Sequence, residues 1–353
     1  MKTGHCTKLV VVIVSYGNPT DVERCLGSLA RSSWADFAVF VCENAGQEAF
    51  NRLRSLLTGE NGPLERDQSS LDTLDRPGGR LAIVTTCRFR GRAISVRLAA
   101  ASENLGYAGG VNAWLERLTV YPGWEAALVL NPDTVVAETC LLELMTKAAE
   151  GFGMVGGTLV LDASPDRIFN YGLHWSRRTG RTIGVGRNFP AAGPPSAALL
   201  TSIDAISGAC MLVTRRFIND VGLMAEDYFL YMEDLDWGLR RGEHKIGFAC
   251  GAVVRHIGGT SIGSAPDPKA RSPLSVYLSS RNSVVFTRRW AGRRWTIHLA
   301  VQLLYVARYL LYGSLVSTKA ALAGVVDGVR GKTGRPDMSV YHPVHRGTDK
   351  CGD

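Results

Sequence analysis

The sequence predicts a doubly wound α/β fold, and three features near the N-terminus support this prediction. Residues 9–14 form an unbroken apolar run rich in valine, which is typical of a parallel strand buried on both faces. A helix signal follows over residues 18–29, and residues 37–42 form a second strand-like run. A strand, a helix and a strand in this order predict a parallel sheet that binds ligands at the carboxyl ends of its strands.

The first helix has a clear start signal. Asn18 is a good capping residue, Pro19 suits the first helical position, and Asp21 places an acid where the helix dipole favours one. Apolar residues then recur at helical spacing at Val22, Cys25, Leu26 and Leu29. A helix therefore links the two strands.

The segment between residues 45 and 103 is longer than a simple connection. We expect an amphipathic stretch, then a polar loop that ends near Arg80, and then a hairpin formed by residues 81–86 and 93–98. The hairpin tip, residues 88–92, is strongly basic.

The remaining elements alternate between strands and helices. A Gly-rich turn at 104–112 opens a helix over 108–118, and a buried strand over 124–130 ends at Asn131-Pro132-Asp133. Further strands are predicted over 154–161, 209–214, 246–249 and 253–256, with a short acidic helix over 233–241 and a strongly apolar stretch over 295–326.

Composition limits the class of protein and its partners. The 353 residues are 46% hydrophobic and 20% charged, as in ordered globular chains. The formal net charge of +8 favours anionic partners: nucleotides, nucleic acid or an anionic membrane surface. Eight scattered cysteines without a Cys-x-x-Cys pair predict small buried hydrophobes in a reducing compartment. The first eight residues do not resemble a signal peptide, so we expect a cytoplasmic protein.

Two acidic motifs are candidates for chemistry. Asp133 follows a buried strand, where a carboxylate can hold a divalent metal against phosphate, although a turn-forming Asp is an equally good interpretation. Glu233, Asp234 and Asp236 lie within four residues, and in a helix Glu233 and Asp236 share a face. Burial and like charge would make such a carboxylate a general base, whereas the alternative is a solvated acidic first turn.

Two glycine-rich turns are candidates for phosphate contacts. The turn at 104–112 opens a helix and can bring backbone N–H groups close to phosphate, but it is neither a Rossmann fingerprint nor a Walker A motif. His256 ends a strand before a second glycine turn, where a metal or phosphate contact competes with a purely structural role.

The order of these motifs resembles the family-2 glycosyltransferases, in particular their rhamnosyltransferase-like branch with a GT-A fold. The resemblance spans roughly residues 9 to 290. It rests on Val-Ile-Val-Ser-Tyr at 12–16, Glu43-Asn44, the turn at 104–112, Asn131-Pro132-Asp133, Ser207-Gly208-Ala209-Cys210, the segment 229–240, the turn at 256–261 and Arg281-Asn282.

The resemblance implies a donor site for a UDP- or dTDP-sugar. Ser15 and Tyr16 would border the nucleobase, and Glu43 would replace the family's usual Asp at the base or ribose. The implied contacts to the rest of the donor are Asn104, Gly106, Gly109, Asn131, Asp133 and Arg281.

The resemblance also implies a metal site and a base. Asp133 matches the last Asp of the family's D-x-D and would bind Mg²⁺ or Mn²⁺ with His256, while Asn131 replaces the first Asp. Asp234, the second acid of the Glu-Asp pair, would be the catalytic base beside Glu233, and the reaction would invert the sugar's configuration. The acceptor would be a hydroxyl of a glycan or of a lipid-linked molecule.

Three regions follow from these predictions. Residues 1–290 would be the GT-A domain, with a donor half at 1–135 and an acceptor half at 136–290. Residues 291–330 would be an amphipathic helical extension, and 331–353 a polar tail.

On a helical wheel, one arc of the extension gathers His298, Gln302, Tyr305, Arg308, Tyr309, Tyr312 and Lys319. An interfacial helix on the cytoplasmic face of a membrane fits this pattern, and packing on the protein itself or in a homodimer is the alternative.

Two other functions compete with catalysis. A nucleic-acid-binding module would use the basic tip at 88–92 and the Arg/Trp stretch at 288–295, but it leaves the strand-end acids unexplained. A non-catalytic membrane-surface protein would be expected to lack Asp133 or Asp234, and both are present.

Overall fold

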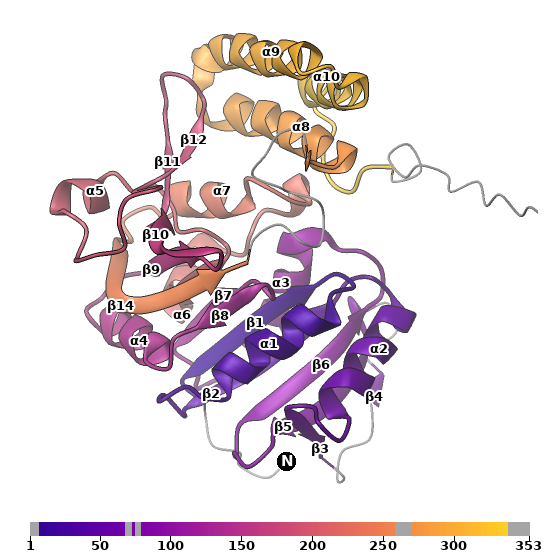
Figure 1. The fold of residues 1–353 in the computed structure, drawn as a ribbon, viewed down its shortest axis with the longest axis vertical. Helices are drawn as coiled ribbons and strands as arrows, with labels where there is room; N and C mark the ends of the chain where they lie inside the picture. The colour runs from indigo at the N-terminus through magenta and orange to yellow at the C-terminus, as the bar shows by residue number, and fades with distance from the viewer. Residues whose placement is uncertain (1–6, 68–72, 75–78, 258–269, 338–353) are drawn as a thin grey trace, which may run out of the picture.

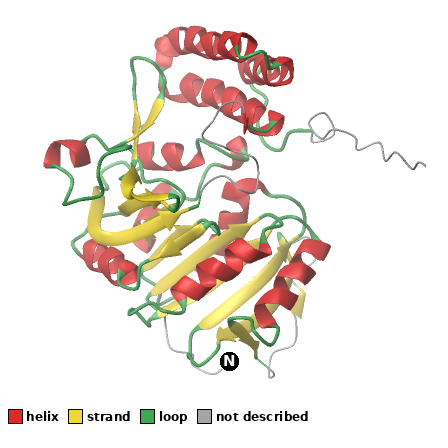
Figure 2. Ribbon diagram, in the orientation of Figure 1, coloured by secondary structure: helices red, strands yellow, loops and turns green. Residues whose placement is uncertain are grey.

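The computed structural model describes residues 7–67, 73–74, 79–257 and 270–337. Predictions for the N-terminal six residues, part of the polar loop before Arg80, the glycine turn after Ile257 and most of the polar tail lie outside these ranges. Within them, a large mixed sheet is covered by helices on both faces, and three helices form a separate layer at one end (Figures 1 and 2). The doubly wound α/β prediction is therefore confirmed.

Four parallel strands form the N-terminal half of the sheet: β1 (Leu9–Ser15), β2 (Phe37–Glu43), β6 (Ser95–Ala101) and β7 (Ala126–Leu130). Their carboxyl ends share one edge, where Ser15 pairs with Glu43 in register and the chain leaves β7 at Asn131. Because β1 is apolar at every core position and enclosed on both faces, all seven of its residues are buried.

The sheet continues with β13 (Cys210–Thr214), β9 (Met154–Leu161), β14 (Ile246–His256) and β8 (Thr134–Val136). β13 runs antiparallel to β7 and to β9, and β14 runs parallel to β9. β14 therefore ends, at His256, on the same edge as β1, β2 and β7. The two strands predicted at 246–249 and 253–256 are one strand, with a register shift between Ala249 and Val253.

The predicted basic hairpin is confirmed as the antiparallel pair β5 (Leu81–Phe89) and β6. The short strands β3 (Leu64–Arg66) and β4 (Thr73–Leu74) pair with β5, and β10 (Ser164–Asn170) pairs with β9. β11 (Leu173–Trp175) and β12 (Thr182–Gly184) form a separate hairpin that projects toward the helical layer (Figure 1).

Helices fill the two faces of the sheet with separate cores. Leu9, Val11 and Ile13 of β1 pack with α1 (Pro19–Leu29), α2 (Gln47–Thr58) and α4 (Cys140–Ala149). The alternate residues Val10 and Val12 pack on the other face with α3 (Gly106–Thr119) and α6 (Arg215–Val221). The alternation of one strand's side chains thus supplies both cores. Five cysteines are buried and free, as expected for small hydrophobes.

The hairpin tip uses its cations within the protein. Arg88 forms an ion pair with Glu65 at 2.8 Å, Arg90 donates to the carbonyls of Gly59 and Gly62, and Arg92 donates to those of Ala30 and Ser32. These bonds hold the hairpin against its neighbours, which argues against the tip as a nucleic-acid-binding patch.

The C-terminal part contains α7 (Glu233–Leu239), α8 (Pro273–Trp290), α9 (Trp295–Leu311) and α10 (Leu315–Val329). Short elements complete the described part: α5 (Ala197–Thr201), η1 (Glu226–Tyr228) and η3 (Gly292–Arg294). The single apolar stretch expected over 295–326 is divided at Gly313, which has a φ of 74°. Helix α8 packs along α10 and belongs to the same layer (Figure 1).

We expect Gly324→Ala to destabilise the fold by about 1–3 kcal/mol, because overpacking at a closed contact costs that much. A Cβ at Gly324 of α10 would lie 2.4 Å from the backbone oxygen of Tyr277 in α8. Gly27→Ala, in the interior of α1, is the matched control, since a Cβ there meets nothing within 4 Å. It should stabilise by about 0.5–1 kcal/mol. Urea unfolding compares the two, and equal effects would contradict the packing described for α8 and α10.

Candidate active site

Ser15 and Glu43 occupy the ends of adjacent strands and are fully buried. One carboxylate oxygen of Glu43, Oε1, accepts hydrogen bonds from the backbone N–H groups of Gly17 and Ala45, both at 2.9 Å. Its other oxygen, Oε2, and the Ser15 hydroxyl have no hydrogen-bond partner. Buried polar atoms without a partner are rare in native proteins, so these two require an explanation. Tyr16, the next residue, is partly exposed.

The glycine-rich turn connects the donor edge to the acceptor half. Gly106 has a φ of 72°, and a Cβ there would lie 2.3 Å from the carbonyl oxygen of Phe229. The backbone N–H of Tyr107 donates to the same carbonyl at 2.8 Å, and Asn44 Nδ2 donates to the Gly106 carbonyl at 2.7 Å. Packing against Phe229 therefore requires a glycine at position 106, whether or not this turn binds phosphate. Asn104 accepts from the Gly106 N–H at 3.1 Å and so shapes this turn.

Asp133 and His256 approach each other from two elements. Asp133 lies in the turn between β7 and β8, and His256 ends β14, which pairs with β8. Asp133 Oδ1 is 3.2 Å from His256 Nε2, and the Ile257 N–H donates to the Asp133 carbonyl at 2.9 Å. His256 Nδ1 is buried without a partner. The two side chains thus converge, whereas a turn-forming Asp would not need the histidine.

Glu233 and Asp234 begin α7, where Glu233 is buried and Asp234 is half-buried. Glu233 is 5% exposed, and its Oε2 has no partner. Burial, followed by the charge of Asp234, raises the pKa of Glu233 to about 8. Burial also raises the pKa of Asp234, against hydrogen bonds from the backbone N–H groups of Gly208 (3.1 Å) and Leu235 (2.8 Å). The alternative of a solvated acidic turn is therefore wrong.

Tyr107 lies close to the acidic pair, because it and Asp234 bond to the same residue, Gly208. Its hydroxyl donates to the Gly208 carbonyl at 2.7 Å, next to the N–H that binds Asp234. Its pKa is raised well above the usual value by burial and then by the charges of Glu233, Asp234 and Asp133. The pKa of Tyr107 is therefore affected by Asp133, which follows β7, and by the two acids that begin α7. The sequence predictions gave Tyr107 no role, although it stands inside the quoted glycine-rich motif.

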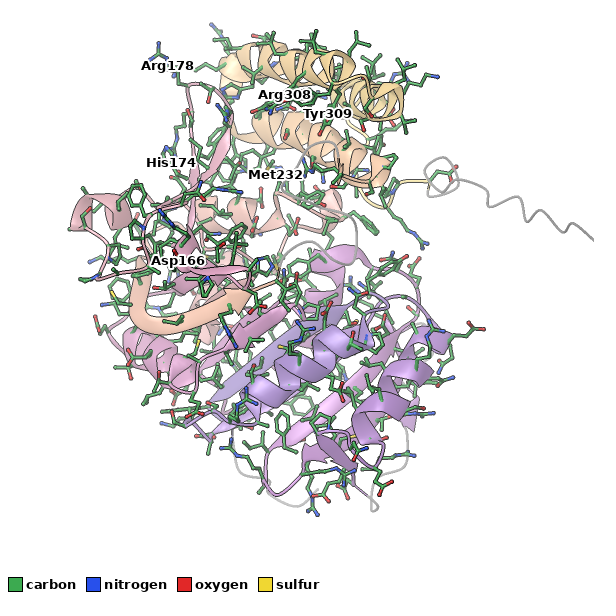
Figure 3. The ribbon with its side chains drawn as sticks, viewed as in Figure 1. Asp166, His174, Arg178, Met232, Arg308 and Tyr309 are labelled. Atoms are coloured by element: carbon green, nitrogen blue, oxygen red, sulfur yellow. The ribbon has the colours of Figure 1, made fainter. Side chains whose placement is uncertain are left out.

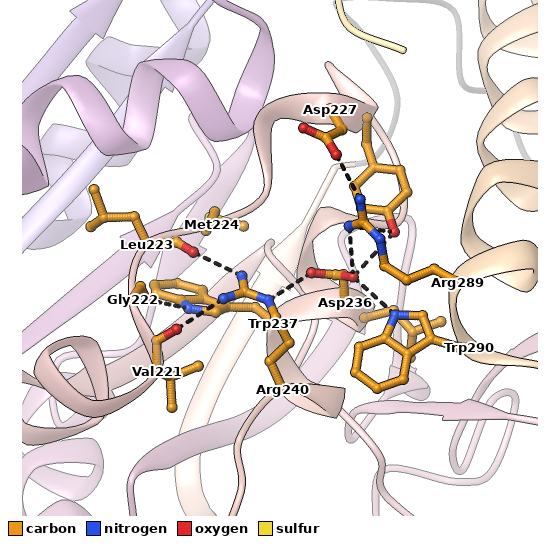
Figure 4. A network of polar contacts seen from close by, with 12 residues as sticks. Val221, Gly222, Leu223, Met224, Asp227, Asp236, Trp237, Arg240, Arg289 and Trp290 are labelled. Carbon is orange, nitrogen blue, oxygen red and sulfur yellow. Dashed lines mark hydrogen bonds and ion pairs between the residues drawn. The ribbon is translucent and has the colours of Figure 1, made fainter. Parts of the chain in front are cut away.

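The third acid of the cluster, Asp236, anchors α7 (Figure 4). Its carboxylate has no exposed surface and accepts from Arg240 at 2.8 Å, Arg289 at 3.3 Å and Trp290 at 2.9 Å. Arg289 and Trp290 belong to α8, so this carboxylate ties the two helices together. Both carboxylate oxygens of Asp236 have hydrogen-bond partners, whereas Glu233 Oε2 has none. Asp236 therefore suits an anchoring role and Glu233 a chemical one.

Two of the implied donor contacts have other surroundings than expected. The Arg281 guanidinium is buried and donates to Asn282 Oδ1, to the Gly334 carbonyl and to the Tyr228 carbonyl at 2.8–3.0 Å. This arrangement favours a positioning role over a phosphate contact. Gly109 is the second such residue. A Cβ there would lie 2.8 Å from Leu105 Cβ, so packing also explains a glycine at this position.

The chain is similar in sequence to known glycosyltransferases. No protein-family model matches the chain. It is 23% identical over 247 residues to the low-salt glycan biosynthesis hexosyltransferase of Haloferax volcanii, which covers 66% of this chain and 76% of that one. It is 26% identical over 234 residues to the N-acetylglucosaminyl-diphospho-decaprenol L-rhamnosyltransferase of Mycobacterium tuberculosis, over 58% of this chain and 72% of that one. The chain is a family-2-like glycosyltransferase.

Structural comparison agrees with the fold of this glycosyltransferase. The solved structure of GalNAc-T7 with UDP, GalNAc and Mn²⁺ superposes with a TM-score of 0.52 at 12% identity, over 82% of this chain and 49% of that one. The fold is the GT-A fold. The two sequence relatives are named for hexosyl and for rhamnosyl transfer.

The proton shared by the acidic pair predicts a pH dependence. We expect kcat/KM of the glycosyltransferase to rise as Asp234 ionises and to fall near pH 8 as Glu233 ionises beside it. Glu233→Gln should keep part of the activity and lose the alkaline limb, because an amide does not titrate. If the alkaline limb persisted unchanged in Glu233→Gln, ionisation of Glu233 would not be its cause.

Stability provides a control that needs no substrate. The pKa of Glu233 is raised on folding, so the folded state binds more protons than the unfolded state between the ordinary Glu pKa and about 8. The wild-type free energy of unfolding should therefore fall, relative to that of Glu233→Gln, as the pH rises through this window. Urea titrations at several pH values measure the difference.

Proposed function

We propose that this enzyme moves a sugar from a UDP- or dTDP-sugar to a hydroxyl acceptor with inversion at the anomeric carbon, assisted by Mg²⁺ or Mn²⁺. The observation that carries the proposal is that three elements meet at Gly208 and Ala209. The Gly208 N–H donates to Asp234 at 3.1 Å, the Tyr107 hydroxyl donates to the Gly208 carbonyl at 2.7 Å, and the N–H of Asn131, two residues before Asp133, donates to the Ala209 carbonyl at 3.1 Å. Asp133 suits the leaving diphosphate, and the acidic pair suits the acceptor, so one site contains both functions that the reaction needs.

The donor would lie along the carboxyl edge of β1, β2 and β7. Ser15 Oγ and Glu43 Oε2 lack partners there, and a nucleobase or ribose offers the donors and acceptors that would satisfy them. Tyr16 and Asn104 flank the same edge. Asn131, directly before the metal carboxylate, offers a neutral amide to the ribose.

Asp133 and His256 fit a divalent cation. A carboxylate oxygen and an imidazole nitrogen 3.2 Å apart can ligate Mn²⁺ or Mg²⁺ together, and the buried His256 Nδ1 shows that the ring is held by packing and not by hydrogen bonds there. Among the described residues, no cluster of three or more such ligands exists, so diphosphate oxygens and water would complete the coordination. When bound, the cation neutralises charge on the leaving diphosphate.

Asp234 would act as the general base. Its carboxylate accepts the acceptor's hydroxyl proton while the acceptor oxygen bonds to the anomeric carbon and the bond to the diphosphate breaks. Glu233, held neutral by burial, avoids a second negative charge beside the base and can donate a hydrogen bond. A single displacement from the face opposite the leaving group inverts the configuration, and no covalent sugar intermediate forms.

Asp234→Asn should lower transfer by about 10²–10⁴-fold and leave donor affinity within a few-fold, because the amide keeps the shape but cannot accept the proton. A thermal-shift screen of UDP- and dTDP-sugars with Mn²⁺ first identifies the donor. Glu233→Gln should leave more activity. NMR of the product reports its anomeric configuration, and retention, or near wild-type transfer by Asp234→Asn, would refute this mechanism.

Asp133→Ala should abolish transfer and weaken the binding of UDP or dTDP in Mn²⁺, while UMP or dTMP binding changes less. The reason is that the cation acts on the diphosphate and hardly on the nucleoside. Calorimetry with the four nucleotides measures the difference. Wild-type turnover by Asp133→Ala would remove the metal from this site.

The C-terminal helices α9 and α10 suggest a membrane as a partner. Helix α9 buries His298 and Gln302 against the protein, contrary to the predicted polar arc at lipid headgroups, and turns large apolar side chains outward. Side chains at least 55% exposed on α9 and α10 are Ile297, Leu304, Leu310, Leu311, Leu315 and Val316. Exposed cations lie close to these residues in the sequence, at Arg293 and Arg294 before α9, at Arg308 four residues after Leu304, and at Lys319 three residues after Val316. Figure 3 places a further exposed cation, Arg178, on the β11–β12 hairpin.

We infer that this apolar face lies on an anionic membrane and brings the site to a lipid-linked acceptor. Apolar side chains bordered by cations are the pattern of interfacial helices. In the described ranges no helix is long and apolar enough to cross a bilayer. The rhamnosyltransferase relative is named for a decaprenol-linked acceptor, which supports the same class of substrate here.

Leu304→Glu with Leu311→Glu should abolish flotation of the full chain with vesicles that contain phosphatidylglycerol. Both side chains are mostly exposed and would face the lipid, where a charge is costly. Val120→Glu, at an equally exposed apolar position after α3, is the control and should float like wild type. Equal flotation of all three proteins would mean that this face packs on protein instead.

A further inference from the structure

The four residues before the catalytic pair form an unusual turn. We call Phe229–Met232 the left-handed turn, because Phe229, Tyr231 and Met232 have φ values of 64°, 72° and 77°. Each such conformation costs an L-residue about 1–2 kcal/mol. The turn ends at Glu233, so its shape decides where the acidic pair begins. A strained turn at this place persists only if its surroundings hold it.

Helix α8 supplies that hold through one amide. Asn282 Nδ2 donates to the carbonyls of Tyr228 at 2.7 Å and Leu230 at 2.6 Å, and lies 3.3 Å from that of Tyr231. Arg281 Nη2 adds a bond to the Tyr228 carbonyl at 3.0 Å. Both side chains are almost fully buried, so these bonds do not compete with water.

Contacts at either end fix the turn from other elements. The Tyr107 N–H of α3 donates to the Phe229 carbonyl at 2.8 Å, and Ser275 of α8 bonds to the Tyr231 hydroxyl at 2.9 Å. Figure 3 places Met232 between α7 and α8. Helix α10 supports α8 from behind, where Gly328 lies close to the Arg281 carbonyl. The turn is therefore enclosed by three elements, and α8 makes most of its bonds.

We propose that Asn282 is a positioning residue for the reaction: by holding the left-handed turn it sets the location of Glu233 and Asp234 without touching the substrate. This inference rests on the proposed role of Asp234 as base. An amide suits the place because its two N–H groups meet carbonyl oxygens and carry no charge. A carboxylate of the same shape would repel those oxygens, and a glutamine would extend one carbon too far.

Asn282→Ala and Asn282→Asp should each lower kcat by about 10²-fold, since a displacement of about 1 Å at a catalytic group costs that much. The Kd for UDP or dTDP in Mn²⁺ should stay within about two-fold, because the donor edge does not contact Asn282. Helix α8 offers a matched control in Arg288→Ala, which removes hydrogen bonds of 3.3 and 2.7 Å to the carbonyls of Gly328 and Val329 in α10. It should lower stability and leave kcat unchanged.

The outcomes separate a positioning role from a structural one. If Arg288→Ala lowered kcat in proportion to its loss of stability, as the Asn282 variants do, or if Asn282→Ala kept wild-type kcat, the proposal would be overturned. If neither Asn282 variant folds, Ser275→Ala removes one bond to the same turn and should lower kcat several-fold without changing nucleotide affinity; no change in kcat would refute the proposal. Near wild-type transfer by Asp234→Asn would instead refute the proposed base, whatever the Asn282 variants do.

Discussion

The placement of two adjacent carboxylates at the start of α7, one buried and one half-buried, is the constraint on which the rest of the site depends. Removing Glu233 and part of Asp234 from water opposes folding unless one keeps its proton and the other finds hydrogen-bond donors. The Gly208 N–H provides one donor to Asp234. The remaining acid, Asp236, is paired with two arginines and so fixes the helix that carries the pair. Acids that are neighbours in the sequence thus differ in their partners: Asp236 is fully paired, whereas one oxygen of Glu233 has no hydrogen-bond partner.

The sheet explains why these acids can meet a diphosphate. Because β1, β2, β7 and β14 all end on one edge, residues separated by more than a hundred positions, such as Asp133 and His256, converge there. The glycine-rich turn then joins this edge to the left-handed turn through the contact between Gly106 and Phe229. Helices α8 and α10 hold that turn from the opposite side. The proposed donor and acceptor sites are therefore positioned by one connected set of backbone contacts.

Features with local causes could be predicted from the sequence, and features with distant causes could not. The valine run of β1 and the start of α1 at Pro19 were predictable because burial and the preference of proline for a first helical turn are local. The predicted cap is wrong in its detail, since the Asn18 side chain makes no capping bond to the backbone and its amide donates to Asp21 Oδ2 at 3.2 Å. The division of residues 295–326 at Gly313 was missed because an apolar stretch does not show which other elements its side chains pack against. Likewise, the polar arc of α9 included His298 and Gln302, yet these contact the protein, since a helical wheel cannot say what lies opposite. Tyr107, Arg281 and Asn282 act through carbonyls brought together only by the fold.

The central claim is that the acidic pair carries one proton near neutral pH and that Glu233 holds it. Infrared difference spectroscopy of wild type against Glu233→Gln tests this directly, because a protonated carboxyl group absorbs apart from a carboxylate. We predict a protonated-carboxyl band in the wild type at pH 6.5 that is absent from Glu233→Gln and disappears from the wild type as the pH is raised past about 8. A wild-type spectrum at pH 6.5 with no such band would contradict the account.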